Sequence, residues 1–339
     1  MTQTMPPVTT GTVSIPVKRR PVPLKLLEAY ALPLLTVLVW VFFALFPASS
    51  GAFPTSNNLN VILGSQAVVA LVAVAALFPL VCGYFDFSLG ATAAMAQVLC
   101  AGLMANVGLP LWAAVIIPIL LGTLVGAVNG FFVTRMGMSP FVTTLGMAML
   151  IAGLMIWYTN GQTIISGIDP ALIRFGSSRL GGVPLVFIIT LGVGAVAWYF
   201  FTHTPYGRSL YAIGSNATAA KLVGLPVRKN VWWSFVVAGS IAGVAGVLQL
   251  ARTGSGTASD GNSLLFPALA AVFLGATAIR PGFFNVIGTL IGAIFVSISV
   301  SGLTLSGASG WASNVFNGVA LLAAVGLSTY LGRRQRSGS

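Results

Sequence analysis

Apolar residues fill long stretches of this chain, and short clusters of Gly, Pro, Ser and Asn interrupt them. Charge-free runs at 29–85, 87–134 and 281–332 are longer than the roughly 20 apolar residues that a helix needs to cross the hydrocarbon core of a membrane. Turn-forming clusters such as 49–58 and 106–110 divide these runs. The pattern predicts about ten membrane-spanning helices, at 29–47, 60–81, 88–105, 111–133, 140–159, 184–202, 231–250, 264–279, 283–305 and 311–331.

The helix predicted at 264–279 differs from the others because it is short and contains Pro267. Proline removes a hydrogen bond from a helix interior and bends the helix there. We expect this segment to be tilted, broken or partly re-entrant.

The positions of Lys and Arg predict the orientation, because these residues gather in the short cytoplasmic loops of membrane proteins. A cytoplasmic amino terminus leaves three basic residues outside, Arg174, Arg179 and Arg252. The basic residues that it places inside are Lys18, Arg19, Arg20, Lys25, Arg135, Arg208, Lys221, Arg228, Lys229, Arg280, Arg333, Arg334 and Arg336. Both termini are therefore predicted to be cytoplasmic.

The domain organisation follows from the same pattern. Residues 1–28 are predicted to form a polar, disordered cytoplasmic tail, residues 29–331 a transmembrane domain with a polar inner loop at 203–230, and residues 332–339 a basic cytoplasmic tail. The first apolar run, 29–47, is longer than the apolar part of a secretory signal. We therefore interpret it as a span, with a cleaved signal as the lesser alternative.

Composition narrows the class of protein. Hydrophobic residues make up 57% of the chain and charged residues 6%, whereas soluble domains have roughly 25% charged residues. This excludes an ordinary cytosolic enzyme and a disordered protein. The excess of basic residues does not indicate a nucleic-acid partner, because they punctuate apolar stretches instead of clustering on a polar domain. The sequence indicates an all-α polytopic membrane protein in contact with lipid.

Candidate catalytic chemistry is sparse. The chain contains no phosphate-binding P-loop and no His-Glu-x-x-His motif, and its one histidine, His203, lies at a predicted helix end. Cys82 and Cys100 lie in apolar runs without the converging ligands of a metal site. We expect no enzyme, no cofactor and no metal, which leaves transport.

Asp86 is the one carboxylate inside apolar sequence, between Phe85 and Phe87. It is either a residue of a transport pathway or a helix cap before Ser88, because Asp accepts hydrogen bonds from free N–H groups at a helix start. One such carboxylate is thin support for ion coupling, so we expect the energy to come from a partner. An ion- or proton-coupled carrier that acts alone through Asp86 remains the alternative.

The loop at 203–230 contains a short helix with its own start and stop signals. Ser215 or Asn216 caps its start, Gly224 ends it in the left-handed conformation, and Pro226 prevents its continuation. Ala219, Leu222 and Val223 form an apolar patch on it. Such a helix either inserts into a groove of a partner protein or rests on the lipid surface.

Several blocks of residues occur in an order that is specific even though each block alone is weak. They are Gly83-Tyr84-Phe85-Asp86-Phe87-Ser88-Leu89-Gly90, Gly126-Ala127-Val128-Asn129-Gly130, Pro140-Phe141-Val142-Thr143-Thr144-Leu145-Gly146, Tyr158-Thr159-Asn160-Gly161, Thr204-Pro205-Tyr206-Gly207-Arg208, Tyr211-Ala212-Ile213-Gly214 and Gly288-Thr289-Leu290-Ile291-Gly292-Ala293. Over residues 53–331 the sequence resembles the membrane permease of ribose-type ATP-binding-cassette importers, which also carry xylose, arabinose and galactose.

The resemblance implies the assembly and the cargo. It implies a permease homodimer in the bacterial plasma (inner) membrane, with two cytoplasmic ATPase subunits and a separate extracytoplasmic sugar-binding protein. The cargo is then a monosaccharide, a pentose or a hexose, moved by alternating access. An importer permease for a nucleoside or an amino acid is a further alternative.

The resemblance also implies where the ATPase binds. The coupling segment of such permeases has a Glu-Ala-Ala-x-x-x-Gly pattern, and here Thr218 occupies the position of the acid. We expect the turn at 278–285 to touch the ATPase as well. The predicted coupling residues are Asn216, Thr218, Ala219, Ala220, Leu222, Val223, Gly224 and Arg280.

A sugar pathway needs polar partners for hydroxyl groups and an aromatic surface. The candidates in or beside spans are Gln66, Asp86, Asn129, Thr143, Thr144, Trp157 and Asn160. Their alternative role is hydrogen bonding between helices, which is common for such residues in membranes. Gly-x-x-x-Gly repeats at 122–130, 239–243 and 288–292 predict close helix packing, and one of them is a candidate for the dimer seam.

Overall fold

The computed structural model describes the backbone of residues 22–336 and the side chains of residues 29–326. Residues 1–21 of the predicted tail at 1–28 lie outside the described backbone, and they include Lys18, Arg19 and Arg20. Residues 22–28 belong to the first helix, which begins before the expected start. The last helix continues to Arg336, so part of the predicted tail at 332–339 is helical.

Helices account for most of the described chain. Ten of them match the predicted ranges in order: α1 (Val22–Leu45), α2 (Ser56–Val81), α3 (Leu89–Ala105), α4 (Leu111–Thr134), α5 (Pro140–Thr159), α7 (Leu185–His203), α10 (Val227–Thr253), α11 (Asp260–Gly275), α12 (Val286–Leu305) and α13 (Gly310–Arg336). The connections carry α6 (Pro170–Ser177), α8 (Pro205–Ser215), α9 (Ala217–Leu222) and a two-stranded antiparallel ribbon of β1 (Arg179–Leu180) and β2 (Val183–Pro184).

Within the described residues, six helices are long and apolar enough to cross a membrane: α2, α4, α5, α7, α10 and α12. The apolar part of α1, together with α3 and α11, is shorter. A count of ten complete spans therefore stays a prediction. The 16-residue helix α11 continues through Pro267, so the expectation that this segment is broken is wrong, and a tilted or partly re-entrant arrangement stays a prediction.

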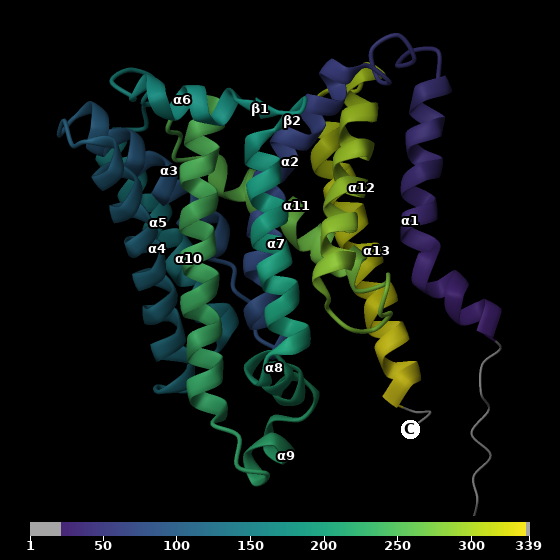
Figure 1. Cartoon of the computed structure of the whole chain (residues 1–339). Helices are drawn as coiled ribbons and strands as arrows, with labels where there is room; N and C mark the ends of the chain where they lie inside the picture. The colour runs from purple at the N-terminus through teal and green to yellow at the C-terminus, as the bar shows by residue number, and fades with distance from the viewer. Residues whose placement is uncertain (1–21, 337–339) are drawn as a thin grey trace, which may run out of the picture.

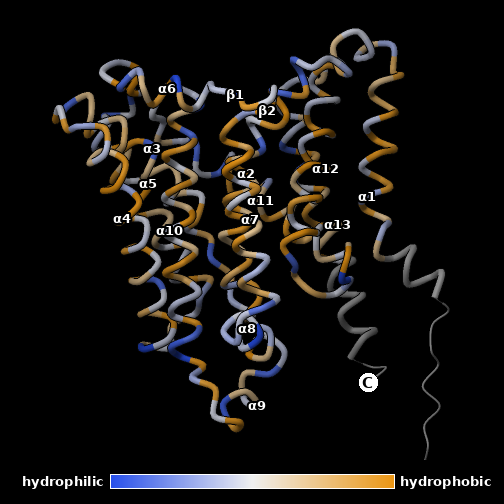
Figure 2. Tube along the Cα trace, in the orientation of Figure 1, coloured by the Kyte–Doolittle hydropathy of each residue, from blue (hydrophilic) through white to orange (hydrophobic). Residues whose placement is uncertain are grey.

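The helices form one bundle with two different ends (Figure 1). The ribbon and α6 lie at one end, and α8 and α9 lie at the other, where α1 begins and α13 finishes. Apolar residues run along the helices, and hydrophilic residues gather at the turns near both ends (Figure 2). Below, these ends are called the α6 end and the α9 end.

Basic side chains separate between the two ends. Arg174 on α6, Arg179 on β1 and Arg252 in the last turn of α10 lie at the α6 end. Among the described side chains, the basic residues at the α9 end are Arg135, Arg208, Lys221, Arg228, Lys229 and Arg280. The side chains of Lys25, Arg333, Arg334 and Arg336 lie outside the described part of the chain.

The core is centred on α2, whose residues 67–81 are buried without a break. A helix that is apolar on every side can be covered only by other helices, and α10, α11, α12 and α7 surround it. Cys82 and Cys100 are both buried, in agreement with a packing role.

The Gly-x-x-x-Gly repeats pack inside the chain. A Cβ on Gly126 of α4 would lie 2.2 Å from the carbonyl oxygen of Phe235 on α10, and one on Gly239 would lie 2.3 Å from that of Gly122. On α12, Gly288 and Gly292 press in the same way against Gly275 and Ala271 of α11. The interpretation of one repeat as the dimer seam is therefore wrong, because these backbones already approach one another within a single chain.

Candidate functional site

The chain leaves the helical conformation between α2 and α3, at residues 82–88, and this break carries Asp86. Pro79 lies in the last turn of α2, and Gly83 has a φ of 87°, which a residue without a side chain adopts readily. Gly214 of α8 packs against the carbonyl of Val81. The break therefore lies inside the bundle, on the side of the α9 end.

Hydrogen bonds join the break to two neighbouring helices. The backbone N–H and the hydroxyl of Ser88 both donate to Asp86 Oδ1, at 2.9 and 2.6 Å. Asn129 on α4 donates from Nδ2 to Ser88 Oγ at 2.8 Å. The Phe87 N–H donates to Thr144 Oγ1 on α5 at 3.0 Å. The structure thus brings together the predicted site residues Asp86, Asn129 and Thr144, and it places Asp86 two residues before Ser88, the N-cap residue of α3, which it holds.

Several buried oxygens at this cluster have no hydrogen-bond partner among the described residues. They are Asp86 Oδ2, Asn129 Oδ1 and the hydroxyl of Thr143, which precedes Thr144. Asp86 is 4% exposed and Asn129 is fully buried. Because an unpaired buried polar atom costs about 1–3 kcal/mol, these atoms suit donors from a hydroxylated solute or from water.

Three predicted pathway residues do not join this cluster. The Trp157 side chain is 76% exposed on the outer face of α5. Asn160 ends α5 in the left-handed conformation, with a φ of 51°, and is exposed. Gln66 lies on α2, half-buried, and its Oε1 has no partner within the described chain. A role for these three residues in a pathway stays a prediction.

The short helix in the inner loop has the predicted caps. The Ala219 N–H donates to Asn216 Oδ1 at 3.0 Å, and Gly224 has a φ of 84°. Leu222 and Val223 at its end are 84% and 76% exposed, whereas Ala220 is 4% exposed and packs into the core. Ala220 therefore packs α9 onto the core of the bundle and does not belong to the exposed apolar patch. Ala219 and Thr218 are exposed.

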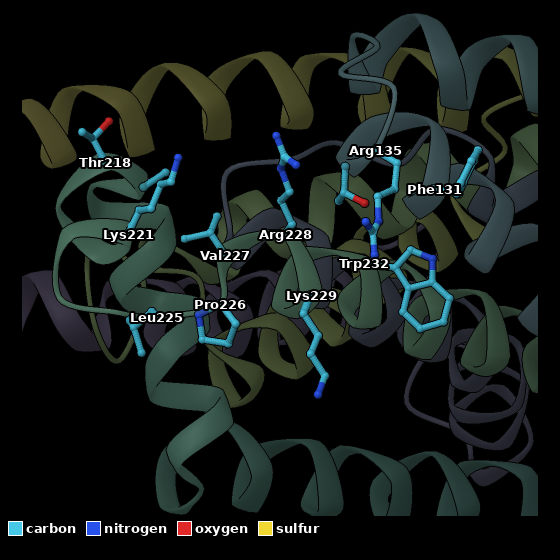
Figure 3. A pocket seen from close by; sticks show the side chains of 12 residues that line it. Phe131, Arg135, Thr218, Lys221, Leu225, Pro226, Val227, Arg228, Lys229 and Trp232 are labelled. Carbon is cyan, nitrogen blue, oxygen red and sulfur yellow. The ribbon is translucent and has the colours of Figure 1, made fainter.

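A basic hollow of about 1200 Å³ lies between α9 and the adjoining ends of α4 and α10 (Figure 3). Its basic residues are Arg135, Lys221, Arg228 and Lys229, and Trp232 and Phe131 supply an apolar wall. Arg280 is separate from this hollow. It lies near Tyr211 of α8, where burial raises the pKa of the Tyr211 phenol and the positive charge of Arg280 opposes that rise.

The structure contains a second polar contact inside the bundle, which was not predicted from the sequence. Gln97 of α3 is fully buried, and its Nε2 donates to the Ser255 carbonyl at 2.8 Å and to Asp260 Oδ2 at 3.1 Å. In the sequence, Asp260 lies four residues before the predicted helix at 264–279. The available signals were an amide in the middle of an apolar run and a carboxylate directly before the short helix with Pro267.

Comparison with known proteins gives consistent matches. The model of the branched-chain amino acid transport system permease component family matches residues 58–325. The ribose import permease protein of Haemophilus influenzae is 32% identical over 84% of this chain and 88% of its own length. The D-allose transport system permease protein of Escherichia coli K12 is 28% identical over 88% of this chain and 91% of its own.

A solved structure of a transporter has a similar fold. It is described as an inward-facing conformation of a metal-chelate type ABC transporter, and it matches with a TM-score of 0.53 at 16% identity. The match covers 89% of this chain and 98% of that one. At this identity the likeness concerns the fold alone.

Proposed function

We infer the function of this chain from the fact that it belongs to the branched-chain amino acid transport system permease component family. It is the membrane permease of an ATP-binding-cassette importer for a monosaccharide. The observation that carries this function is the identity of 32% with a ribose import permease over nearly the full length of both chains. The similarity to a D-allose permease extends the proposed range of cargo from pentoses to hexoses.

Membership of this family places the chain in the bacterial inner membrane as a multi-pass protein, with ATPase subunits and a solute-binding protein as partners. The ATPase subunits hydrolyse ATP, and this chain supplies the path. We propose that the α9 end faces the cytoplasm. The segregation of basic residues supports this orientation, because cytoplasmic loops carry the excess of Lys and Arg.

The proposed docking site for the ATPase is the exposed tip of α9. Leu222 and Val223 project from the bundle on a helix that is capped at both ends and supported by buried Ala220. Exposed apolar residues on a loop that projects from the bundle are typical of a surface that binds a groove on a partner protein. The four basic residues of the hollow beside α9 give this surface a positive charge.

We propose that the permease is a homodimer and that α5 forms the seam. Only 22% of the most apolar 18-residue stretch of α5 is buried, compared with 28% for α4 and for α7 and 78% for α2. Gly146 and Gly153 of α5 have open space where a side chain would stand. Small residues allow helices to approach closely in membranes, so this face can accept the same face of a second copy.

The function is tested by reconstitution in liposomes with the cognate ATPase subunits and binding protein. We expect uptake of radiolabelled D-ribose or of another pentose or hexose in a tested panel, and we expect it to require ATP inside the liposomes with the ATPase. Uptake by the permease alone, driven by a proton gradient, would contradict the importer and favour the carrier that acts through Asp86.

A further inference from the structure

Helix α11 begins inside the bundle and not at its surface. Gly261, in its first turn, lies against Gly90 of α3, where a Cβ would be 2.2 Å from the Gly261 carbonyl oxygen. At 1.5 Å per residue, Gly90 is about 22 Å from Ala105, the end of α3 at the α6 end, and Gln97 is about 12 Å from it. The spans α4 and α10, with 24 and 27 residues, are about 36 and 40 Å long.

The loop that enters the bundle to reach this start is held by named contacts. Gly256 forms an isolated bridge with Ile164 of the outer loop. Further in, the Gln97 amide holds both the Ser255 carbonyl and the Asp260 carboxylate. Gln97 is fully buried, and its own Oε1 has no hydrogen-bond partner among the described residues. An acceptor without a donor therefore lies beside the start of α11.

The exposed face of α11 at this depth is polar. Ser259, Asn262 and Ser263 are exposed, and Phe266 is 46% exposed one turn further along. Their spacing puts them on one stripe of the helix. The opposite side, with Leu264, Leu265 and Ala268, is buried. The Ser263 hydroxyl donates to the Asp260 carbonyl of its own helix at 2.7 Å. Polar groups are costly in contact with lipid and face water or protein instead, so we expect this stripe to face water or another protein surface.

The chemistry of the stripe suits a sugar. Hydroxyl and amide groups both donate and accept hydrogen bonds, and the Asp260 carboxylate and Gln97 Oε1 add acceptors. The first N–H groups of a helix that starts within a membrane are donors that no helical carbonyl satisfies. Phe266 adds an apolar surface for the C–H face of a ring.

We propose that this stripe, with Asp260 and Gln97 at its start, contacts the hydroxyl groups of the transported monosaccharide inside the membrane. The proposal rests on the proposed function, and it assigns solute contact to residues of α11 and α3 that are separate from the Asp86 cluster. Phe266 supplies the apolar side of the contact, and the buried Gln97 amide fixes the carboxylate of Asp260.

Thiol labelling tests whether the stripe faces water. In proteoliposomes that hold the full transporter, Ser263→Cys is treated with 2-sulfonatoethyl methanethiosulfonate, a charged reagent that does not enter lipid. The matched control is Val196→Cys, which lies in the middle of α7 and is 71% exposed. The native cysteines are buried, and the unmodified chain gives their background. We expect labelling of Ser263→Cys to be at least tenfold faster than that of the control, and we expect it to block uptake of D-ribose.

Uptake by substituted transporters tests the contact itself. Asn262→Ala is expected to lower ATP-driven D-ribose uptake at least tenfold while ATP turnover by the complex stays within twofold. Thr304→Ala is expected to change neither rate more than twofold, because Thr304 is exposed on α12 and its hydroxyl donates to the Val300 carbonyl of the same helix.

Two results would overturn the proposal. One is labelling of Ser263→Cys as slow as that of Val196→Cys, including the case in which two copies of Ser263→Cys form a disulfide. The other is unchanged uptake after complete labelling or in Asn262→Ala. Failure of the proposed function is a different result, because the unmodified transporter would then show no ATP-driven uptake of any sugar. The labelling rates would still decide whether water reaches the stripe.

Discussion

The carboxylate of Asp86 accepts two hydrogen bonds from Ser88, one from the backbone N–H at 2.9 Å and one from the hydroxyl at 2.6 Å. Both bonds end on Oδ1, and Oδ2 is buried without a partner among the described residues. One oxygen thus holds Ser88, the N-cap residue of α3, and the other is free to meet a donor. A local role before the helix and a pathway role, the two interpretations of Asp86 from the sequence, can therefore fall to different oxygens of the same side chain.

This division predicts the behaviour of two substitutions at Asp86. Asn caps a helix about as well as Asp, whereas loss of a cap costs about 0.5–2 kcal/mol. We expect Asp86→Asn to fold, because its Oδ1 can still accept from Ser88, but to lower ATP-driven uptake, because its Nδ2 cannot accept a hydrogen bond where Oδ2 can. We expect Asp86→Ala to lower the unfolding temperature in detergent as well. Unchanged uptake by a stably folded Asp86→Asn transporter would contradict a pathway role for Oδ2.

Docking through α9 predicts a loss of coupling without a loss of folding. Leu222→Glu combined with Val223→Glu is expected to abolish the stimulation of ATP turnover by the permease, because both side chains are exposed and the changes place two charges on the apolar tip. Leu180→Glu, 66% exposed on β1 at the opposite end of the bundle, is the control and should leave turnover unchanged. Normal stimulation in the double variant would remove α9 from the interface.

A seam along α5 predicts cross-linking between two copies. Gly146→Cys or Gly153→Cys is expected to form an intermolecular disulfide on mild oxidation in membranes, because a disulfide needs Cα atoms within about 7 Å. Val196→Cys on α7 should stay monomeric under the same conditions. The measurement is the dimer band on a non-reducing gel. Dimers from Val196→Cys alone would place the seam on another face.

Close packing of α4 on α10 predicts opposite results at two helical glycines. Gly126→Ala would put a methyl group 2.2 Å from the Phe235 carbonyl oxygen, and overpacking of this kind costs about 1–3 kcal/mol. Gly192→Ala on α7 meets nothing within 4 Å and is expected to be neutral or stabilising by up to about 1 kcal/mol. Thermal unfolding in detergent measures both. Equal stability of the two variants would argue against this packing.

The sequence located the ten helices of the apolar runs, although α11 begins four residues before the predicted 264 and the short helices α6 and α8 were not predicted. A run of apolar residues between turn-forming clusters has one stable form in lipid, because each backbone polar group must be satisfied within the segment. The caps of α9 were equally local, since Asn216 and Gly224 act on their own neighbours in the chain. The break at Asp86 was also visible, as a carboxylate and a glycine between two apolar runs.

Contacts between distant segments were not visible in the sequence. The same Gly-x-x-x-Gly spacing serves a dimer seam or an internal contact, and only the approach of Gly126 to Phe235 showed which. Ala220 and Val223 look alike as small apolar residues of one loop, yet one is buried and the other exposed.

By itself the sequence determined that this chain is a bundle of membrane helices with charge kept to the connections, because hydrophobicity and turn chemistry act locally along the chain. Only the tertiary structure decided that α11 starts within the bundle and that Gln97 meets Asp260 there. The physical reason is that a hydrogen bond between residues 163 positions apart depends on how α3, α10 and α11 pack, and local sequence preferences carry no information about that packing.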